Sequence, residues 1–178
     1  MYGCQQELIN NPEFIPFLEY LCTTANKLIN YGIYLARQWY FKLGYITGKY
    51  DLGKQLKSNF NYQFLHSQAA QETLRLVTES FQSYKELSHQ HLAGHLSNKP
   101  RLPKYRKKGG LEVITYPKQA LRLKENQVRV PLGKKVKAVF KVDIFLLHFS
   151  NNFDWKKIRE IRIIPRNNCF YVQWVYQL

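Results

Sequence analysis

A run of cationic side chains around one tyrosine is the part of this sequence best suited to chemistry with a ligand. Residues 98–110 read NKPRLPKYRKKGG, with prolines that oppose a helix at the start and two glycines at the end. The segment carries Lys99, Arg101, Lys104, Tyr105, Arg106, Lys107 and Lys108. Because such a density of charge cannot be buried unpaired, we expect it at the surface, where cations contact phosphates and the ring stacks on a base or sugar.

The positive charge of the chain is regional. Residues 99–141 hold fourteen Lys or Arg and two acids, and this region, which includes Lys118, accounts for most of the formal net charge of +15. A concentrated basic region favours a docking face for nucleic acid. Acidic membrane lipid is the alternative partner, and it is less favoured because the basic run lacks an apolar helical face for insertion. No apolar run is long enough to predict a membrane span.

Polar residues on two predicted helices form a second set of candidates for binding. They are Lys27, Asn30 and Tyr31 on the first long helix, and Ser67, Gln68 and Gln71 at the start of the second. Asn and Gln side chains can pair with the edge of adenine in a major groove. The alternative is the ordinary polar face of an amphipathic helix.

Catalytic and metal-binding patterns are weak. Asp143 stands without a second carboxylate, and His91 and His95 have the i, i+4 spacing of a zinc pair but no third ligand. The three cysteines are widely spaced, and we expect them to be buried or half-buried thiols. The sequence therefore predicts no catalytic residue, no metal site and no cofactor.

The pattern of apolar residues predicts an α+β fold with helices first. We expect a short strand at 4–9, a helix from 11 to about 43 with Asn11 as its N-cap, a short helix after Asp51, and a long helix from about 64 to 92. Short β-branched runs follow and predict antiparallel strands at 111–116, 121–123, 128–130, 136–142 and 145–149. The last two runs, 158–164 and 169–178, predict a hairpin with its turn at 165–168.

Four segments in a fixed order carry a resemblance to a known family. They are SQAAQETLRLVTESFQSY (67–84), KPRLPKYRKKGG (99–110), VRVPLG (128–133) and IREIRIIPRNNCFYVQWVY (158–176), and the helix NKLINYGIYLARQWY (26–40) fits as well. Together they resemble the N-terminal half of TnpB, the OrfB-type insertion-sequence transposases, and cyanobacterial members most of all. The resemblance implies a wedge-like β-barrel with a helical recognition lobe inserted near its start. Residues 1–10 would form the first wedge strand, 11–97 the lobe, and 98–178 the basic loop and the wedge.

The family consists of RNA-guided DNA endonucleases, so the resemblance also implies partners. The lobe and wedge would bind a guide-like structured RNA and a short motif in double-stranded DNA, with residues 67–71 and the first helix near that motif and residues 101–108 on the backbone. The aspartate, glutamate and CxxC motifs of the family's RuvC nuclease are not in this sequence. We therefore expect a truncated, nucleic-acid-binding portion in the cytoplasm, associated with the nucleoid, that does not cleave by itself.

Two alternatives remain open at this point. In the first, a separate chain supplies the RuvC domain and completes a split nuclease; the aromatic residues Tyr171, Trp174 and Tyr176 motivate it, because a strand cut from its partner domain can expose apolar surface. In the second, the sequence is a decayed reading frame that folds poorly.

Overall fold

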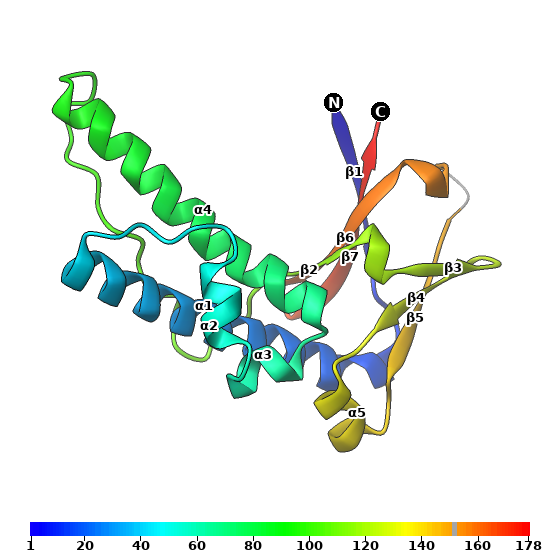
Figure 1. Ribbon diagram of the computed structural model, residues 1–178. Coiled ribbons are helices and arrows are strands. Elements are labelled where there is room, and N and C mark those ends of the chain that lie inside the picture. The colour runs from blue at the N-terminus through cyan, green and yellow to red at the C-terminus, as the bar shows by residue number, and fades with distance from the viewer. Residues whose placement is uncertain (151–152) are drawn as a thin grey trace.

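The computed structural model describes residues 1–150 and 153–178, and it confirms the α+β class (Figure 1). The helices are α1 (Ile15–Leu43), α2 (Asp51–Leu56), α3 (Phe60–Phe64), α4 (Ser67–Leu92) and α5 (Lys134–Phe140). The strands are β1 (Tyr2–Leu8), β2 (Ile114–Pro117), β3 (Arg122–Lys124), β4 (Gln127–Pro131), β5 (Ile144–His148), β6 (Ile158–Arg166) and β7 (Cys169–Gln177).

The strands form two antiparallel sheets, one of four strands in the order β1-β7-β6-β2 and one of three in the order β3-β4-β5. β1 pairs with β7 along its length, from Tyr2 opposite Gln177 to Leu8 opposite Tyr171. The first and last strands are therefore neighbours, and α1 to α4 form an insertion between β1 and β2 (Figure 1). Hydrogen-bonded pairing among the described residues leaves the two sheets separate, and neither closes into a barrel.

The predicted end of the first long helix is confirmed, but its predicted cap is wrong. α1 ends at Leu43, and Gly44 follows at φ 64° with its N–H bonded to the carbonyl of Tyr40 at 2.9 Å. Glycine reaches this left-handed conformation without the steric cost that other residues meet, which is why it ends helices. At the other end a short 3-10 turn, Pro12–Phe14, precedes α1, and the side chain of Asn11 accepts no capping hydrogen bond.

The second long helix begins later than predicted, because the chain breaks after Phe64. Phe60–Phe64 is a separate helix, Leu65 and His66 have extended backbone with ψ of 153° and 138°, and α4 starts at Ser67. Ala70, Leu74, Val77 and Phe81 follow one another at three- and four-residue steps, so they share one face of α4, and all four are buried. Leu87 is exposed, because the end of α4 projects beyond the rest of the fold (Figure 1).

The strand predicted at 136–142 is wrong, since Lys134–Phe140 forms helix α5. Three β-branched valines in 136–142 favoured a strand, but the apolar residues Val136, Val139 and Phe140 have the three- and four-residue spacing of a helix. Val136 is buried and Val139 is exposed, so α5 has one inward side. The other predicted strands and the final hairpin are present, with boundaries shifted by a few residues.

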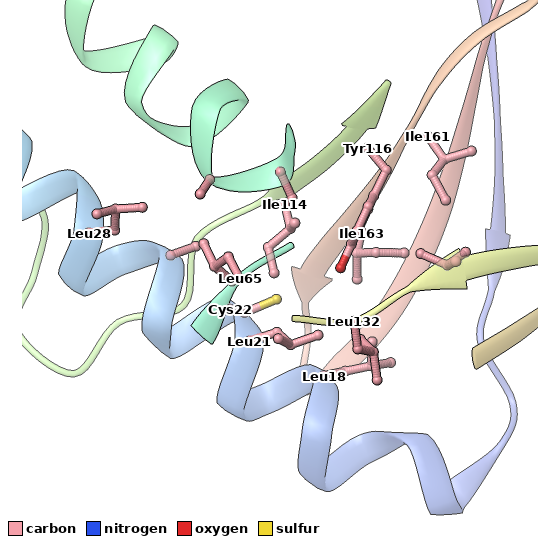
Figure 2. Close-up of a cluster of buried hydrophobic side chains, with 14 of the residues drawn as sticks. Leu18, Leu21, Cys22, Leu28, Leu65, Ile114, Tyr116, Leu132, Ile161 and Ile163 are labelled. Carbon is pink, nitrogen blue, oxygen red and sulfur yellow. The ribbon is translucent and has the colours of Figure 1, made fainter. Parts of the chain in front are cut away.

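One continuous apolar core joins the helices to both sheets. Figure 2 shows Leu18, Leu21 and Cys22 of α1 together with Ile114 and Tyr116 of β2, and with Leu132 that follows β4. Tyr116 is fully buried, and this burial raises the pKa of its phenol far above the ordinary value. The start of α1 is thus fixed against the sheets, while its second half extends away from them (Figure 1).

Candidate nucleic-acid interface

The basic loop, residues 98–110, lies along α1. The Asn30 amide clamps its main chain twice: Nδ2 donates to the carbonyl of Arg106 at 3.2 Å, and Oδ1 accepts from the N–H of Arg106 at 2.7 Å. Just after the loop, the N–H of Glu112 donates to the carbonyl of Cys22 at 3.1 Å. The loop is therefore held against the helix, although it has no regular secondary structure of its own.

Arg37 fixes the other part of the loop. Its Nη1 donates to the carbonyl of Pro103 at 3.1 Å, and its guanidinium carbon lies 5.4 Å from the centre of the Tyr105 ring and 5.7 Å from that of Phe41. A guanidinium over a ring face is attracted by the ring quadrupole. Arg37 therefore links the one aromatic side chain of the loop to an aromatic side chain of α1.

Most of the charge of the basic loop is free to meet a ligand. Nε of Arg106 pairs with Oε2 of Glu112 at 2.8 Å. In the part of the chain that the structure describes, no ion pair is formed by Lys99, Arg101, Lys104, Lys107 or Lys108, and all five are exposed. A row of unneutralised cations at fixed positions along a helix can replace the counterions of a phosphate backbone.

Of the predicted residues of the first helix, the structure joins Asn30 to this loop. Lys27 and Tyr31 are exposed on α1. One N–H of the Asn30 amide and its oxygen bond the main chain of Arg106, so Asn30 acts as a clamp for the loop.

Ser67 and Gln71 lie on a different basic surface. Ser67 lines a cleft of about 800 Å³ whose cations are Lys54, Lys57, Lys134 and Lys135, which we call the lysine groove. Gln71 lines an adjoining hollow of about 390 Å³ that shares Lys54 and Lys57 and adds Lys49 and Arg75. Sequence reasoning missed these lysines, because α2 and α5 bring them together from distant parts of the chain.

Close packing of α5 on the segment after α3 forms the lysine groove. A Cβ on Gly133 would lie 2.5 Å from the carbonyl oxygen of Phe64 and 2.9 Å from the carbonyl carbon of Leu65, so only glycine allows this approach. Nζ of Lys135 lies 5.1 Å from the centre of the Phe60 ring. His66 lines the same groove; partial burial lowers the pKa of its imidazole, and its Nδ1 has no hydrogen-bond partner among the described residues.

Two predicted site residues fit neither surface well. Nζ of Lys118 donates to the carbonyls of Trp155 and Lys156 at 2.9 and 2.7 Å, so its ammonium already bonds the main chain of the fold. Gln68 is half-buried on α4 and lines neither the lysine groove nor the adjoining hollow. Of the other predicted residues, Ser67 lines the lysine groove, Gln71 lines the adjoining hollow, and Lys27 and Tyr31 are exposed on α1.

The remaining polar candidates serve local roles. Asp143 pairs with Nζ of Lys137 at 3.1 Å, and this lysine lowers the pKa of the carboxyl. Nδ1 of His91 lies 2.8 Å from the carbonyl of Leu96. Within residues 1–150 and 153–178, no group of three or more His, Cys, Asp or Glu is placed to hold a metal ion. The same ranges contain no helix with the length and apolar character needed to cross a membrane.

Two expectations about burial are wrong. Cys22 is buried as predicted, but Cys4 and Cys169 are exposed, because each occupies an outward position on its strand. Trp174 was expected to expose apolar surface, yet it is fully buried against Phe149, with ring centres 5.3 Å apart. Tyr171 and Tyr176, the other two aromatic residues that motivated a missing partner domain, are half-buried, so the burial of Trp174 removes one of the three observations behind that alternative.

Comparison with known proteins adds no family. No protein-family model matches the chain, and no curated protein matches it either. The candidate interface consists of the five free cations of the basic loop, whose main chain is held along α1, and a second group of lysines near the start of α4.

Proposed function

We propose that this chain binds nucleic acid as the N-terminal, non-cleaving portion of a TnpB-like protein, with a guide-like structured RNA and target-adjacent double-stranded DNA as its ligands. One observation carries the proposal: the exposed, unpaired cations of the basic loop lie on a main chain that Asn30 and Arg37 hold against α1 at Arg106 and Pro103. A mobile cationic tail would lose conformational entropy on binding, whereas a loop that is already fixed loses less.

The order of the elements supports the TnpB-like part of this proposal. β1 pairs with β7, so that α1 to α4 form an insertion after the first strand, which agrees with a recognition lobe inserted into a wedge. In this proposal the two antiparallel sheets correspond to a barrel-like wedge and α1 to α4 form the lobe.

The two basic surfaces receive different roles. The basic loop presents Lys104, Lys107 and Lys108 as a row, which suits the backbone of RNA or DNA without regard to sequence. The lysine groove combines cations with polar groups, Ser67 within it and Gln71 in the adjoining hollow, which suits a duplex read at its base edges. The target-adjacent DNA motif is therefore assigned to the groove.

The salt dependence of binding tests the proposal through three quadruple-alanine variants. The loop variant replaces Lys104, Arg106, Lys107 and Lys108; the groove variant replaces Lys54, Lys57, Lys134 and Lys135; and the control replaces the exposed Lys85, Lys124, Lys156 and Lys157. Each lost phosphate contact reduces the magnitude of the slope of log K against log salt by about 0.9 for duplex DNA. With four cations removed, the slope of the loop variant and that of the groove variant should each become shallower by up to about 3.6. The control should retain the wild-type slope.

An unchanged slope in the loop variant would contradict the assignment of the basic loop. The RNA ligand has its own test, which is to sequence the RNA that co-purifies with the wild-type chain. We expect one enriched, structured RNA. A random mixture that moderate salt removes would contradict the guide-RNA part of the proposal and leave only unspecific binding.

A further inference from the structure

The outward face of α1 carries three exposed aromatic side chains. Tyr31, Tyr34 and Phe41 are 50%, 54% and 62% exposed, and we call them the aromatic stripe. At 100° per residue all three lie within about 80° of one another around the helix, opposite the face that packs into the core. Lys27, Gln38 and Lys42 share this outward face.

We propose that unpaired bases of single-stranded nucleic acid stack on the aromatic stripe and on Tyr105, while the cations of the basic loop hold the phosphates. This inference rests on the proposed function and deepens it, because it names the form of nucleic acid that α1 takes. Aromatic rings stack on any base, since every base has a π-face, and a positively charged track beside them is the usual arrangement in proteins that bind single strands.

Arg37 connects the aromatic stripe to the basic loop, because its guanidinium lies near one ring of each. The guanidinium of Arg37 lies between Phe41 and Tyr105, 5.7 Å from the centre of one ring and 5.4 Å from the other. Tyr34 and Phe41 are seven residues apart, which is about 10 Å along a helix axis. Bases can therefore stack at two positions along the axis of α1, one at Tyr34 and one at Phe41. The basic loop, which Asn30 and Arg37 hold on the same helix, carries the cations for the phosphates.

The charge around the stripe selects a polyanion. No Asp or Glu occurs between Tyr20 and Tyr50, whereas Lys27, Arg37 and Lys42 lie on this stretch. Glu112, the acid nearest the loop, is paired with Arg106 at 2.8 Å. A second copy of this chain, with its formal net charge of +15, would meet like charge here, so self-association through the stripe is disfavoured.

The composition of the stripe favours bases over a lipid surface. A helix that inserts into a membrane boundary presents a broad apolar side rich in Leu, Phe and Trp. Here two of the three rings are tyrosines, and the amide of Gln38 lies on the same face. Paired bases in a duplex are stacked on one another and unavailable to such rings, so the stripe distinguishes single strands from duplexes.

Binding of two DNA probes to the Tyr34→Ala/Phe41→Ala variant tests the proposal. The probes are fluorescein-labelled oligo(dT) and a blunt duplex of equal length. Each stacked ring contributes roughly tenfold in affinity, so the double variant should bind oligo(dT) roughly a hundredfold more weakly and the duplex with little change. Its salt slope should equal that of the wild type, because no phosphate contact is removed. The control is Tyr2→Ala, which removes an exposed ring on β1.

Several outcomes overturn the proposal. Equal losses for oligo(dT) and duplex, or no loss for either, exclude stacking on these rings. Retention on phosphatidylserine vesicles that falls in the double variant, with oligo(dT) binding unchanged, assigns the stripe to a membrane. If the wild type binds oligo(dT) with a steep salt slope and the double variant behaves identically, only the stacking inference fails. If the wild type binds no nucleic acid, the proposed function fails with it.

Photo-crosslinking gives a readout that does not depend on affinity. Oligo(dT) in which 5-iododeoxyuridine replaces thymidine reacts with an aromatic side chain stacked on the modified base. We expect labelled peptides that contain residues 31–41 or Tyr105. Label confined to other parts of the chain overturns the proposal. Circular dichroism of the variants should match the wild type, since all the altered side chains are exposed.

Discussion

The basic loop and the lysine groove are both cationic surfaces, but the chain builds them in opposite ways. The loop takes its charge from one contiguous segment, and a few hydrogen bonds from Asn30 and Arg37 place it on α1. The groove takes Lys54 from α2, Lys57 from the next residue after α2, and Lys134 and Lys135 from α5, and it depends on the packing of α5 against the segment after α3. The difference teaches that a contiguous run of charged residues is evident from the sequence, whereas a cluster of charged residues from distant segments depends on tertiary packing.

The two surfaces should therefore fail in different ways. Damage to the packing beneath the groove should lower the stability of the whole fold, since Phe64 and Leu65 belong to the core. Damage to the clamp on the loop should leave the core intact and release only the loop. Three substitutions, two of them with a matched second variant, sharpen this comparison.

Gly133→Ala should have the largest effect on stability. The new Cβ would lie 2.5 Å from the carbonyl oxygen of Phe64, which is main chain and cannot rotate away. The φ of Gly133 is −64°, so the backbone conformation suits any residue and only the lack of space matters. Overpacking of this kind costs about 1–3 kcal/mol. Urea unfolding at equilibrium measures the change.

Gly53→Ala is the matched control. Gly53 lies within α2, and a Cβ there meets no atom within 4 Å. Alanine in a helix is more favourable than glycine by about 0.5–1 kcal/mol, so this variant should be more stable than the wild type. The prediction is contradicted if the urea midpoint of Gly133→Ala rises together with that of Gly53→Ala, because the close approach at Gly133 would then not limit the packing of α5.

The sequence predicts local features that short-range sterics and hydrogen bonding determine. Gly44 ends α1 at the predicted place because the left-handed conformation favours glycine. The final hairpin turns at Asn167 and Asn168, whose φ values of 54° and 57° belong to a region that asparagine tolerates better than most residues. The charge of the basic loop is equally evident, because six cations stand close together in the sequence.

Features that depend on distant contacts were not predicted. α5 was expected to be a strand because the three valines of 136–142 favour one locally, but packing of Gly133 on Phe64 and Leu65 places a helix there. The four lysines of the groove come from two segments far apart in the sequence, so no pattern links them. The clamp of the loop by Asn30 likewise joins residues of two distant segments.

Asn30→Ala should have an intermediate effect, confined to the loop. It removes both hydrogen bonds to the main chain of Arg106. A typical hydrogen bond contributes about 0.5–1.5 kcal/mol to stability, and these two are exposed, so each should fall near the lower end of that range. Hydrogen exchange should show faster exchange of the Arg106 amide, while the amides of β6 and β7 keep their protection. Uniformly faster exchange across the fold would mean that Asn30 supports the core as well as the loop.

Asn30→Asp separates the clamp from the charge of the surface. A carboxylate still accepts from the N–H of Arg106, so the loop should regain most of its protection from exchange. The added negative charge lies among the cations of the loop, so binding of nucleic acid should stay weaker than in the wild type. If protection and affinity recover together, affinity depends on the position of the loop more than on its charge.

His66 in the lysine groove should give the smallest effect and a dependence on pH. Partial burial lowers the pKa of its imidazole below the ordinary value of about 6.5, because a buried cation loses its hydration. The unfolded chain therefore binds this proton more tightly than the folded one. The contribution of His66 to stability is complete above about pH 6.5 and is lost as the pH falls through the lower, folded pKa.

Urea unfolding of the wild type and of His66→Gln as a function of pH measures this contribution. The wild type should lose more unfolding free energy than the variant on acidification from neutral pH, and parallel profiles would show that the burial of His66 has no energetic consequence.

Bound duplex DNA should oppose the loss, since a phosphate in the groove stabilises the imidazolium. Affinity for the duplex should therefore rise on acidification in the wild type and in the loop variant, but less in His66→Gln. A pH response that the loop variant abolishes would instead place the duplex on the basic loop, away from the lysine groove.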